Sequence, residues 1–222
     1  MKIACVGYRD WATTIYQKLQ LEFPEHEFLL QLTESDFCDS AIIKFQPELL
    51  LFYGWSQIIS ERLVMTFNCL MLHPSPLPKY RGGSPIQNQI IRGETKSAVT
   101  IFLMDKGIDT GPIAEQKEIE LAGSLVEIFE RISTVGFDLT CKIICEGLTV
   151  YAQDEREATF FHRRKPQESE ITIDELKNKS SLYLYNKIRM LQDPYPNAFF
   201  TTSDGKRLVM KNVTIEDVET RT

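Results

Sequence analysis

Two short segments decide how this chain folds: LHPSPLPKYRGG, residues 72–83, and MDKGIDTG, residues 104–111. Each follows an apolar run of strand-like composition, and each carries one ionisable side chain of interest, His73 in the first and Asp109 in the second. Open α/β sheets bind their ligands in the loops that follow the carboxyl ends of strands. Both loops hold more proline and glycine than a plain turn requires, so we expect them to carry chemistry at adjacent strand ends.

The rest of residues 1–150 alternates between strand-like and helix-like segments. Strands are expected at residues 2–7, 27–32, 47–54, 68–72, 98–104 and 113–121, and helices at 11–21, 84–92 and 124–147. The last helix has Ser124 as N-cap and Glu127 three residues later, which is the pattern of a capping box. Strands that alternate with helices predict an α/β fold, a mostly parallel sheet flanked by helices on both faces.

Residues 151–222 have a different character. A helix is expected from Ser180, and Asp193-Pro194 ends it. A hairpin is expected at 198–213, because Asp204-Gly205 is a strong hairpin dipeptide. No flexible linker separates this part from the preceding residues. The sequence therefore predicts a small C-terminal α+β subdomain, helix plus hairpin, packed on the core.

Composition limits the classes of function. The 222 residues are 43% hydrophobic and 25% charged, the balance of a globular protein. No apolar run approaches the roughly 18 residues of a transmembrane helix, and the N-terminus lacks a signal-peptide pattern, so we expect a cytoplasmic protein without a membrane partner. The net charge of −6 argues against tRNA as the main partner, because nucleic-acid binding needs a basic face. Five cysteines without metal-ligand spacing are expected to be reduced core thiols, and no metal site is expected.

The two segments resemble the core motif of the folate-dependent formyltransferases, which reads roughly Asn-x-His-Pro-Ser-x-Leu-Pro-x-Tyr-x-Gly and then Asp-x-Gly-x-Asp-Thr-Gly. The matching positions are His73, Pro74, Ser75, Leu77, Pro78, Tyr80, Gly82, Asp105, Gly107, Asp109, Thr110 and Gly111. The resemblance implies a Rossmann-like formyltransferase core, 10-formyltetrahydrofolate as co-substrate, and His73 and Asp109 as the catalytic pair. It also implies folate contacts, mostly through the backbone, at Trp55, Ser56, Gln57, Gly83, Asp105, Lys106, Gly107, Ile108 and Asp109.

One position departs from the family pattern. The family's asparagine, two residues before the histidine, is Met71 here. Asn68 is near in sequence, but side chains alternate along a strand, so Asn68 would point to the face opposite His73. Loss of one oxyanion donor costs about 3–4 kcal/mol in other enzymes. A backbone N–H or an ordered water is therefore expected to take the place of the missing amide.

The catalytic pair suits acyl transfer from a folate nitrogen to a substrate amine. A carboxylate beside an imidazole fixes the tautomer of the ring and favours the imidazolium. His73 would then donate to the oxyanion of the tetrahedral intermediate. Asp109 would take up the amine proton, directly or through water.

The acceptor is implied by the C-terminal part, which resembles amino-sugar formyltransferases at Arg164-Lys165-Pro166, Asn186–Arg189 and Pro194–Phe199. The family's tRNA-acting members carry a further C-terminal barrel, which the chain is too short to include. We therefore expect a nucleotide-linked amino sugar, with Arg163, Arg164, Lys165 and Tyr195 near its diphosphate or base. Two alternatives remain open: a glycinamide ribonucleotide-type formyltransferase, and a folate-binding protein that has lost catalysis. A homodimer is one assembly that the resemblance allows.

Overall fold

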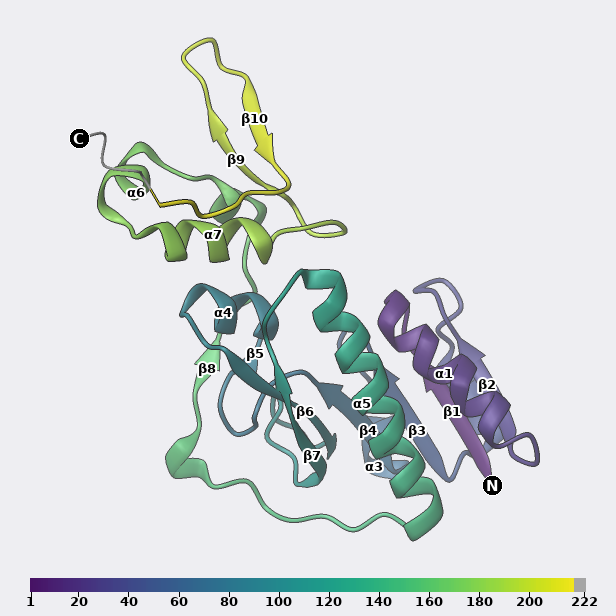
Figure 1. Ribbon diagram of the computed structural model, residues 1–222. Helices are drawn as coiled ribbons and strands as arrows, with labels where there is room; N and C mark the ends of the chain where they lie inside the picture. The colour runs from purple at the N-terminus through teal and green to yellow at the C-terminus, as the bar shows by residue number, and fades with distance from the viewer. Residues whose placement is uncertain (218–222) are drawn as a thin grey trace.

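The computed structural model describes residues 1–217, which form a six-stranded sheet with helices on both faces and a smaller C-terminal part (Figure 1). The strand order is β2-β1-β3-β4-β6-β7. The strands are β1 (Lys2–Val6), β2 (Glu27–Gln31), β3 (Leu49–Tyr53), β4 (Cys69–His73), β6 (Lys96–Leu103) and β7 (Ile113–Glu120). The first four run parallel, β6 runs antiparallel to β4, and β7 antiparallel to β6. The mostly parallel α/β sheet expected from the sequence is confirmed.

The helices divide between the two faces of the sheet. They are α1 (Asp10–Glu22), α2 (Asp39–Phe45), α3 (Glu61–Thr66), α4 (Pro85–Ile91) and α5 (Leu125–Glu146). α1 and α5 pack with Ile3 and Cys5 of β1, whereas α2 and α3 pack with Ala4 and Val6 of the same strand. This is the period-two alternation of a strand buried on both sides. α5 begins with the expected capping box, in which Ser124 and Glu127 exchange hydrogen bonds.

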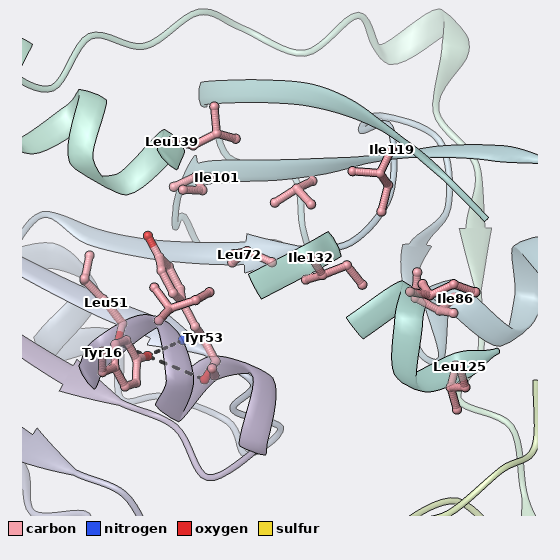
Figure 2. Close-up of a cluster of buried hydrophobic side chains, with 14 of the residues drawn as sticks. Tyr16, Leu51, Tyr53, Leu72, Ile86, Ile101, Ile119, Leu125, Ile132 and Leu139 are labelled. Atoms are coloured by element: carbon pink, nitrogen blue, oxygen red, sulfur yellow. Dashed lines mark hydrogen bonds between the residues drawn. The ribbon is translucent and has the colours of Figure 1, made fainter. Parts of the chain in front are cut away.

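A buried hydroxyl joins α1 to the sheet within the larger core cluster (Figure 2). The Tyr16 hydroxyl accepts the N–H of Tyr53 at 2.8 Å and donates to the carbonyl of Val6 at 2.9 Å. A buried polar group of this kind is tolerated only when it is paired. These bonds fix α1 against the carboxyl ends of β1 and β3, and so they position the loops that leave those strands.

The chain leaves α5 and runs along the core before it forms the C-terminal part. Tyr151 pairs with Ile113 of β7, and β8 (Phe160–Phe161) forms a short parallel pair with β5 (Arg81–Gly82). The remaining elements are η1 (Glu155–Glu157), η2 (Pro166–Ser169), α6 (Ile173–Asn178), α7 (Ser181–Arg189), β9 (Ala198–Thr201) and β10 (Arg207–Met210). The last two form the expected hairpin around Asp204-Gly205, which extends away from the sheet in Figure 1.

α7 is fastened to the core through its last turn. Arg189 Nη1 donates to the carbonyl oxygens of Leu121 and Gly123, at 2.8 and 3.1 Å. Gln192 accepts the N–H of Leu125, the first residue of α5. Arg189, the last residue of the Asn186–Arg189 motif, therefore joins α7 to the core. None of the helices in residues 1–217 is long and apolar enough to cross a lipid bilayer.

Some features differ from the expectations. The sequence pattern does not predict α2 and α3, because helices of seven and six residues are too short to show a clear amphipathic period. Two cysteines, Cys38 and Cys145, are exposed, so the expectation that all five are core thiols is wrong for them. Both lie in or next to helices, where the helical period turns some positions to solvent.

Candidate active site

His73 is the last residue of β4, and only 6% of its surface is exposed. Its ring nitrogen Nε2 lies 2.8 Å from the carbonyl oxygen of Tyr80. A carbonyl oxygen can only accept a hydrogen bond, so Nε2 carries a proton and donates it. The loop after β4 thus sets the tautomer of His73. Tyr80 presents its carbonyl from a left-handed backbone conformation, with φ of 61°.

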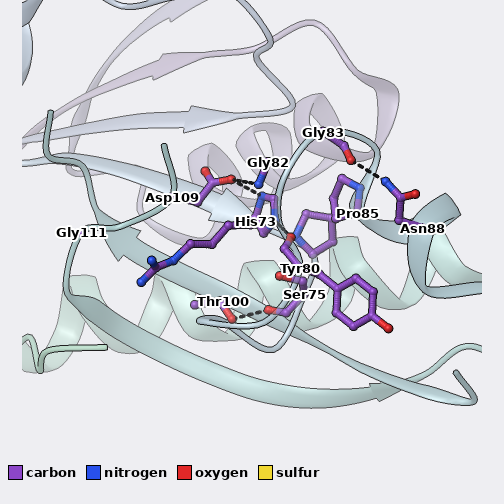
Figure 3. Close-up of polar contacts among 12 residues, drawn as sticks. His73, Ser75, Tyr80, Gly82, Gly83, Pro85, Asn88, Thr100, Asp109 and Gly111 are labelled. Carbon is purple, nitrogen blue, oxygen red and sulfur yellow. Dashed lines mark hydrogen bonds and ion pairs between the residues drawn. The ribbon is translucent and has the colours of Figure 1, made fainter. Parts of the chain in front are cut away.

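Asp109 reaches His73 by a route that the sequence did not indicate. β6 runs antiparallel to β4, with Thr100 opposite His73. The C-terminal end of β6 therefore lies beside the N-terminal end of β4, away from His73. The expectation that the two residues follow adjacent strand ends is therefore wrong, since an apolar run indicates a strand but not its direction. Instead the loop of residues 104–112 folds back, and Asp109 Oδ2 lies 3.5 Å from His73 Nδ1 (Figure 3).

The His73–Asp109 pair is buried and is tied to the first loop. Asp109 is 8% exposed, and its Oδ2 also accepts the N–H of Gly82 at 2.7 Å. An imidazole and a carboxylate can each give or accept a proton, so the two side chains together can do so next to a substrate.

Hydrogen bonds from the antiparallel strands pin the first loop. Thr100 of β6 donates its hydroxyl to the carbonyl of Ser75 at 2.6 Å, and Gln116 of β7 donates to the carbonyl of Leu77 at 3.0 Å. Ser75 in turn donates to the carbonyl of Lys79, at 2.9 Å, across the loop. The loop is therefore held through its backbone carbonyl groups. Proline removes an N–H donor but leaves these acceptors in place.

A residue that sequence reasoning missed joins the two loops. Gln153, on the segment between α5 and β8, donates to the carbonyl oxygens of Asp109 and Gly111, at 2.9 and 2.7 Å. Its own oxygen accepts from Arg81 at 2.7 Å, and Arg81 is further held by Glu155 through two bonds of 2.9 and 2.7 Å. Nothing in the pattern near Gln153 indicates this role, because both partners lie more than forty residues earlier in the chain.

Gly83 allows the C-terminal part to approach the first loop. A Cβ on Gly83 would lie 2.3 Å from the backbone of Arg163, so no other residue fits there without displacing that segment. The N–H of Gly83 donates to the carbonyl of Phe161 at 2.8 Å. Arg163 is thereby held against Gly83, the residue that follows Gly82 in the chain. The N–H of Gly82 donates to Asp109.

Met71 occupies an apolar environment. It lies two residues before His73 on the same side of β4, and it packs beside the buried side chains of Leu77 and Phe102. Asn68 instead donates its side-chain amide to the carbonyl of Glu48 at the start of the strand. As the alternation of the strand indicates, Asn68 does not replace the family's asparagine.

The expected folate residues after β3 lie at the same sheet edge as His73, because Tyr53 pairs with Leu72 in parallel register. The Trp55 ring is 8% exposed and packs against Phe37, with ring centroids 4.9 Å apart. Its indole Nε1 is buried and has no hydrogen-bond partner within residues 1–217. Ser56 shares a hydrogen bond with the hydroxyl of Tyr8, and Gln57 donates to Glu34 at 3.0 Å.

The second loop is held by Asp105, whose Oδ1 accepts the N–H of Gly107 at 2.9 Å and the hydroxyl of Thr110 at 2.6 Å. Lys106 pairs with Glu61 at the start of α3, and this hydrogen bond lowers the pKa of Glu61. Ile108 leaves 64% of its surface exposed. This exposed apolar side chain precedes Asp109 on the same loop, where a ligand can contact it.

The expected acceptor residues do not act as one cluster. Arg164 donates to the carbonyl of Glu168 at 2.9 Å, and the N–H of Lys165 donates to the carboxylate of Glu168 at 2.5 Å, so these two residues build η2. Arg163, in contrast, lies next to Gly83. The structure therefore places Arg163 beside the first loop and turns Arg164 and Lys165 toward their own segment.

Comparison with known proteins identifies relatives of this arrangement. The Formyl transferase family model matches residues 20–135. A methionyl-tRNA formyltransferase of a Nitratiruptor species is 32% identical, over 85% of this chain and 73% of that protein. The chain spans little more than half the length, 53–57%, of the other curated relatives that were compared.

Two solved structures share the fold. The methionyl-tRNA formyltransferase from Clostridium thermocellum has a TM-score of 0.85 at 31% identity, covering 94% of this chain and 96% of that one. A likely sugar N-formyltransferase from Mycobacterium tuberculosis has a TM-score of 0.79 at 21% identity, covering 98% and 99%, and supports the fold alone. Because the family model matches more than half of its residues, this chain belongs to the Formyl transferase family of one-carbon transfer enzymes.

Proposed function

We propose that this protein is an N-formyltransferase that moves the formyl group of 10-formyltetrahydrofolate to the amine of a nucleotide-linked amino sugar. The observation that carries the proposal is the buried His73–Asp109 pair, held at 3.5 Å inside a formyltransferase fold. The folate would lie between the segment after β3 and the 104–112 loop. The buried N–H of Trp55, which has no partner within residues 1–217, and the exposed side chain of Ile108 suit a flat heterocycle with a polar edge.

The residues of the pair divide the proton chemistry. The amine must be neutral to attack the formyl carbon, and the attack creates an oxyanion and a proton to be removed. Asp109 takes that proton and passes it to the folate nitrogen as its bond to the formyl carbon breaks. His73, with both ring nitrogens protonated, would donate from Nδ1, which lies 3.5 Å from Asp109, to the oxyanion. The C–N bond to the substrate amine replaces the C–N bond to the folate, and the amine proton ends on the folate nitrogen.

Formyl transfer is tested by incubating the protein with 10-formyltetrahydrofolate and a panel of nucleotide-linked amino sugars. We expect one acceptor to gain the mass of one formyl group with the native protein, and this product to be missing when His73→Ala replaces it. Absence of product across a broad amine panel, with tetrahydrofolate still bound, would support instead the folate-binding protein without catalysis. Turnover of glycinamide ribonucleotide would support the purine-type alternative.

A second candidate acceptor is methionyl-tRNA, because the 32% identical relative carries that name. The net charge of −6 weighs against it, since tRNA binding gains most of its affinity from neutralised phosphates. The two candidates are separated by kcat/KM for initiator methionyl-tRNA and for the nucleotide-linked sugars in the same assay. The cytoplasmic location and a homodimer stay predictions, and light scattering in solution would test the second.

A further inference from the structure

Asp109 holds a backbone conformation that few residues adopt. Its φ is 57°, in the left-handed region, which aspartate tolerates better than most residues other than glycine. Two hydrogen bonds hold the residue there. Its Oδ2 accepts the N–H of Gly82 at 2.7 Å (Figure 3), and its carbonyl oxygen accepts the side-chain amide of Gln153 at 2.9 Å. This conformation places the carboxylate beside His73, so the groups that hold it also hold the catalytic pair.

The amide of Gln153 can bind in only one orientation. Its Nε2 donates to the carbonyl oxygens of Asp109 and Gly111, which can only accept. Its Oε1 accepts from Nε and Nη2 of Arg81, at 3.1 and 2.7 Å, and these nitrogens can only donate. A rotation of the amide by a half turn would place oxygen against oxygen and N–H against N–H. Arg81 therefore determines which way Gln153 faces.

The guanidinium of Arg81 is buried and makes four hydrogen bonds. Its side chain is 7% exposed, and besides the two bonds to Gln153 it donates from Nη1 and Nη2 to the two carboxylate oxygens of Glu155, at 2.9 and 2.7 Å. A planar guanidinium can bind both partners at once, whereas a lysine ammonium lacks this geometry. A neutral side chain in place of Arg81 would leave the Gln153 amide free to turn.

The backbone of Arg81 is linked to Asp109 as well. Its N–H donates to the carbonyl of Thr159 at 2.9 Å, as part of the pairing between β5 and β8. Gly82, the next residue, belongs to the same pair and donates its N–H to the Asp109 carboxylate. Arg81 is therefore connected to both ends of Asp109, to the carboxylate through its backbone and to the carbonyl through its side chain.

We infer that Arg81 is a positioning residue that keeps Asp109 in the conformation which places its carboxylate beside His73. The side chain of Arg81 acts through the amide of Gln153. This inference rests on the proposed function and adds to it a residue that touches no reacting atom. Loss of the guanidinium should misplace Asp109 and leave the folate site in place. Misplacement by about 1 Å can lower a rate about 100-fold, so the loss should appear in kcat.

The test is a double-variant cycle of Arg81→Met and Gln153→Ala. We expect Arg81→Met to lower kcat about 10- to 100-fold, with tetrahydrofolate affinity unchanged in a titration. In the Gln153→Ala background the same substitution should lower kcat by less than about twofold, because members of one hydrogen-bond network are not additive. Arg156→Met is the matched control. It removes an exposed guanidinium that pairs with Asp154 on the same segment, and it should leave kcat unchanged.

Arg81→Lys takes the place of Arg81→Met in the cycle if the methionine variant does not fold. It keeps the positive charge and loses the planar geometry, so we expect kcat to fall about tenfold. A second measurement needs no substrate. Hydrogen exchange of the Gly82 N–H, followed by NMR, should be about tenfold faster in Arg81→Lys and in Gln153→Glu, which keeps an oxygen for Arg81 but lacks the amide donors. Arg156→Met should not change this exchange.

The outcomes separate the inference from the proposed function. Native kcat in a folded Arg81 variant, or the same loss of kcat in both backgrounds, would overturn the inference while the native protein still formylates amino sugars. Native exchange of the Gly82 N–H in both Arg81→Lys and Gln153→Glu would also overturn it. Faster exchange in both variants, with no amino sugar formylated by the native protein, would overturn the proposed function and leave the placement of Asp109 by Arg81 standing.

Discussion

The two loops around His73 differ from α4 and the segment after β3 in how many buried polar groups have hydrogen-bond partners within the chain. His73, Asp109, Arg81 and Gln153 all have hydrogen-bond partners in the chain. On α4 and after β3, Gln87 Nε2 and Trp55 Nε1 have none among the described residues. Catalytic groups work best when they are fixed before the substrate arrives. Recognition groups instead complete their hydrogen bonds with the ligand.

The largest effect should come from substitutions in the two loops around His73, where the polar groups already have partners. We expect His73→Ala or Asp109→Ala to lower kcat/KM by orders of magnitude while the fold is retained. The double variant should be little worse than either single one, because groups that act as a unit fail together. Steady-state kinetics with saturating folate measure this. Near-native turnover in either single variant would remove the mechanism.

Gln153→Ala should cost less, because it touches no reacting atom. Loss of its bonds to Asp109 and Gly111 frees the second loop, and a misplacement of about 1 Å can lower a rate about 100-fold. We expect a fall of about 10- to 100-fold in kcat with folate affinity unchanged. Gln167→Ala, at an exposed position on η2, is the matched control. A variant that lost affinity for folate but kept kcat would assign Gln153 to binding.

The basic residues after β8 should respond through acceptor affinity. Arg163→Gln is expected to raise the acceptor KM by about tenfold, with kcat nearly unchanged, and to weaken the salt dependence of acceptor binding. Arg164→Gln should instead lower the unfolding temperature, because Arg164 is bound to Glu168. If both variants change the acceptor KM alike, the basic residues act as one patch and the division seen in the structure has no functional meaning.

The smallest effect is expected at Met71. Met71→Asn would place an amide among Leu77, Phe102 and Ile113 without partners of its own, which costs about 1–3 kcal/mol. We expect a lower unfolding temperature and no gain in kcat, because the site is built around an apolar side chain. A clear rise in kcat at constant folate affinity would show that the missing amide limits the reaction.

The sequence predicted what local pattern determines and failed where distant segments meet. The apolar runs of β1 and β3 and the capping box of Ser124 specify their elements locally, and these were predicted. The direction of β6 was not, because its apolar run fits a strand of either direction. The role of Gln153 was invisible for a related reason: it depends on a segment with no regular structure that returns to the catalytic loops.

The short pairing of β5 with β8 has a consequence for exchanging parts between relatives. It binds residues 81–82 of the catalytic loop to residues 160–161, and Gln153 and Tyr151 hold the same segment to the core. A chimaera cut at residue 150 would therefore replace the residues that hold the His73 and Asp109 loops together with the C-terminal part. A graft that begins after Arg163 keeps the β5–β8 pairing and the contacts of Gln153 and Tyr151 native.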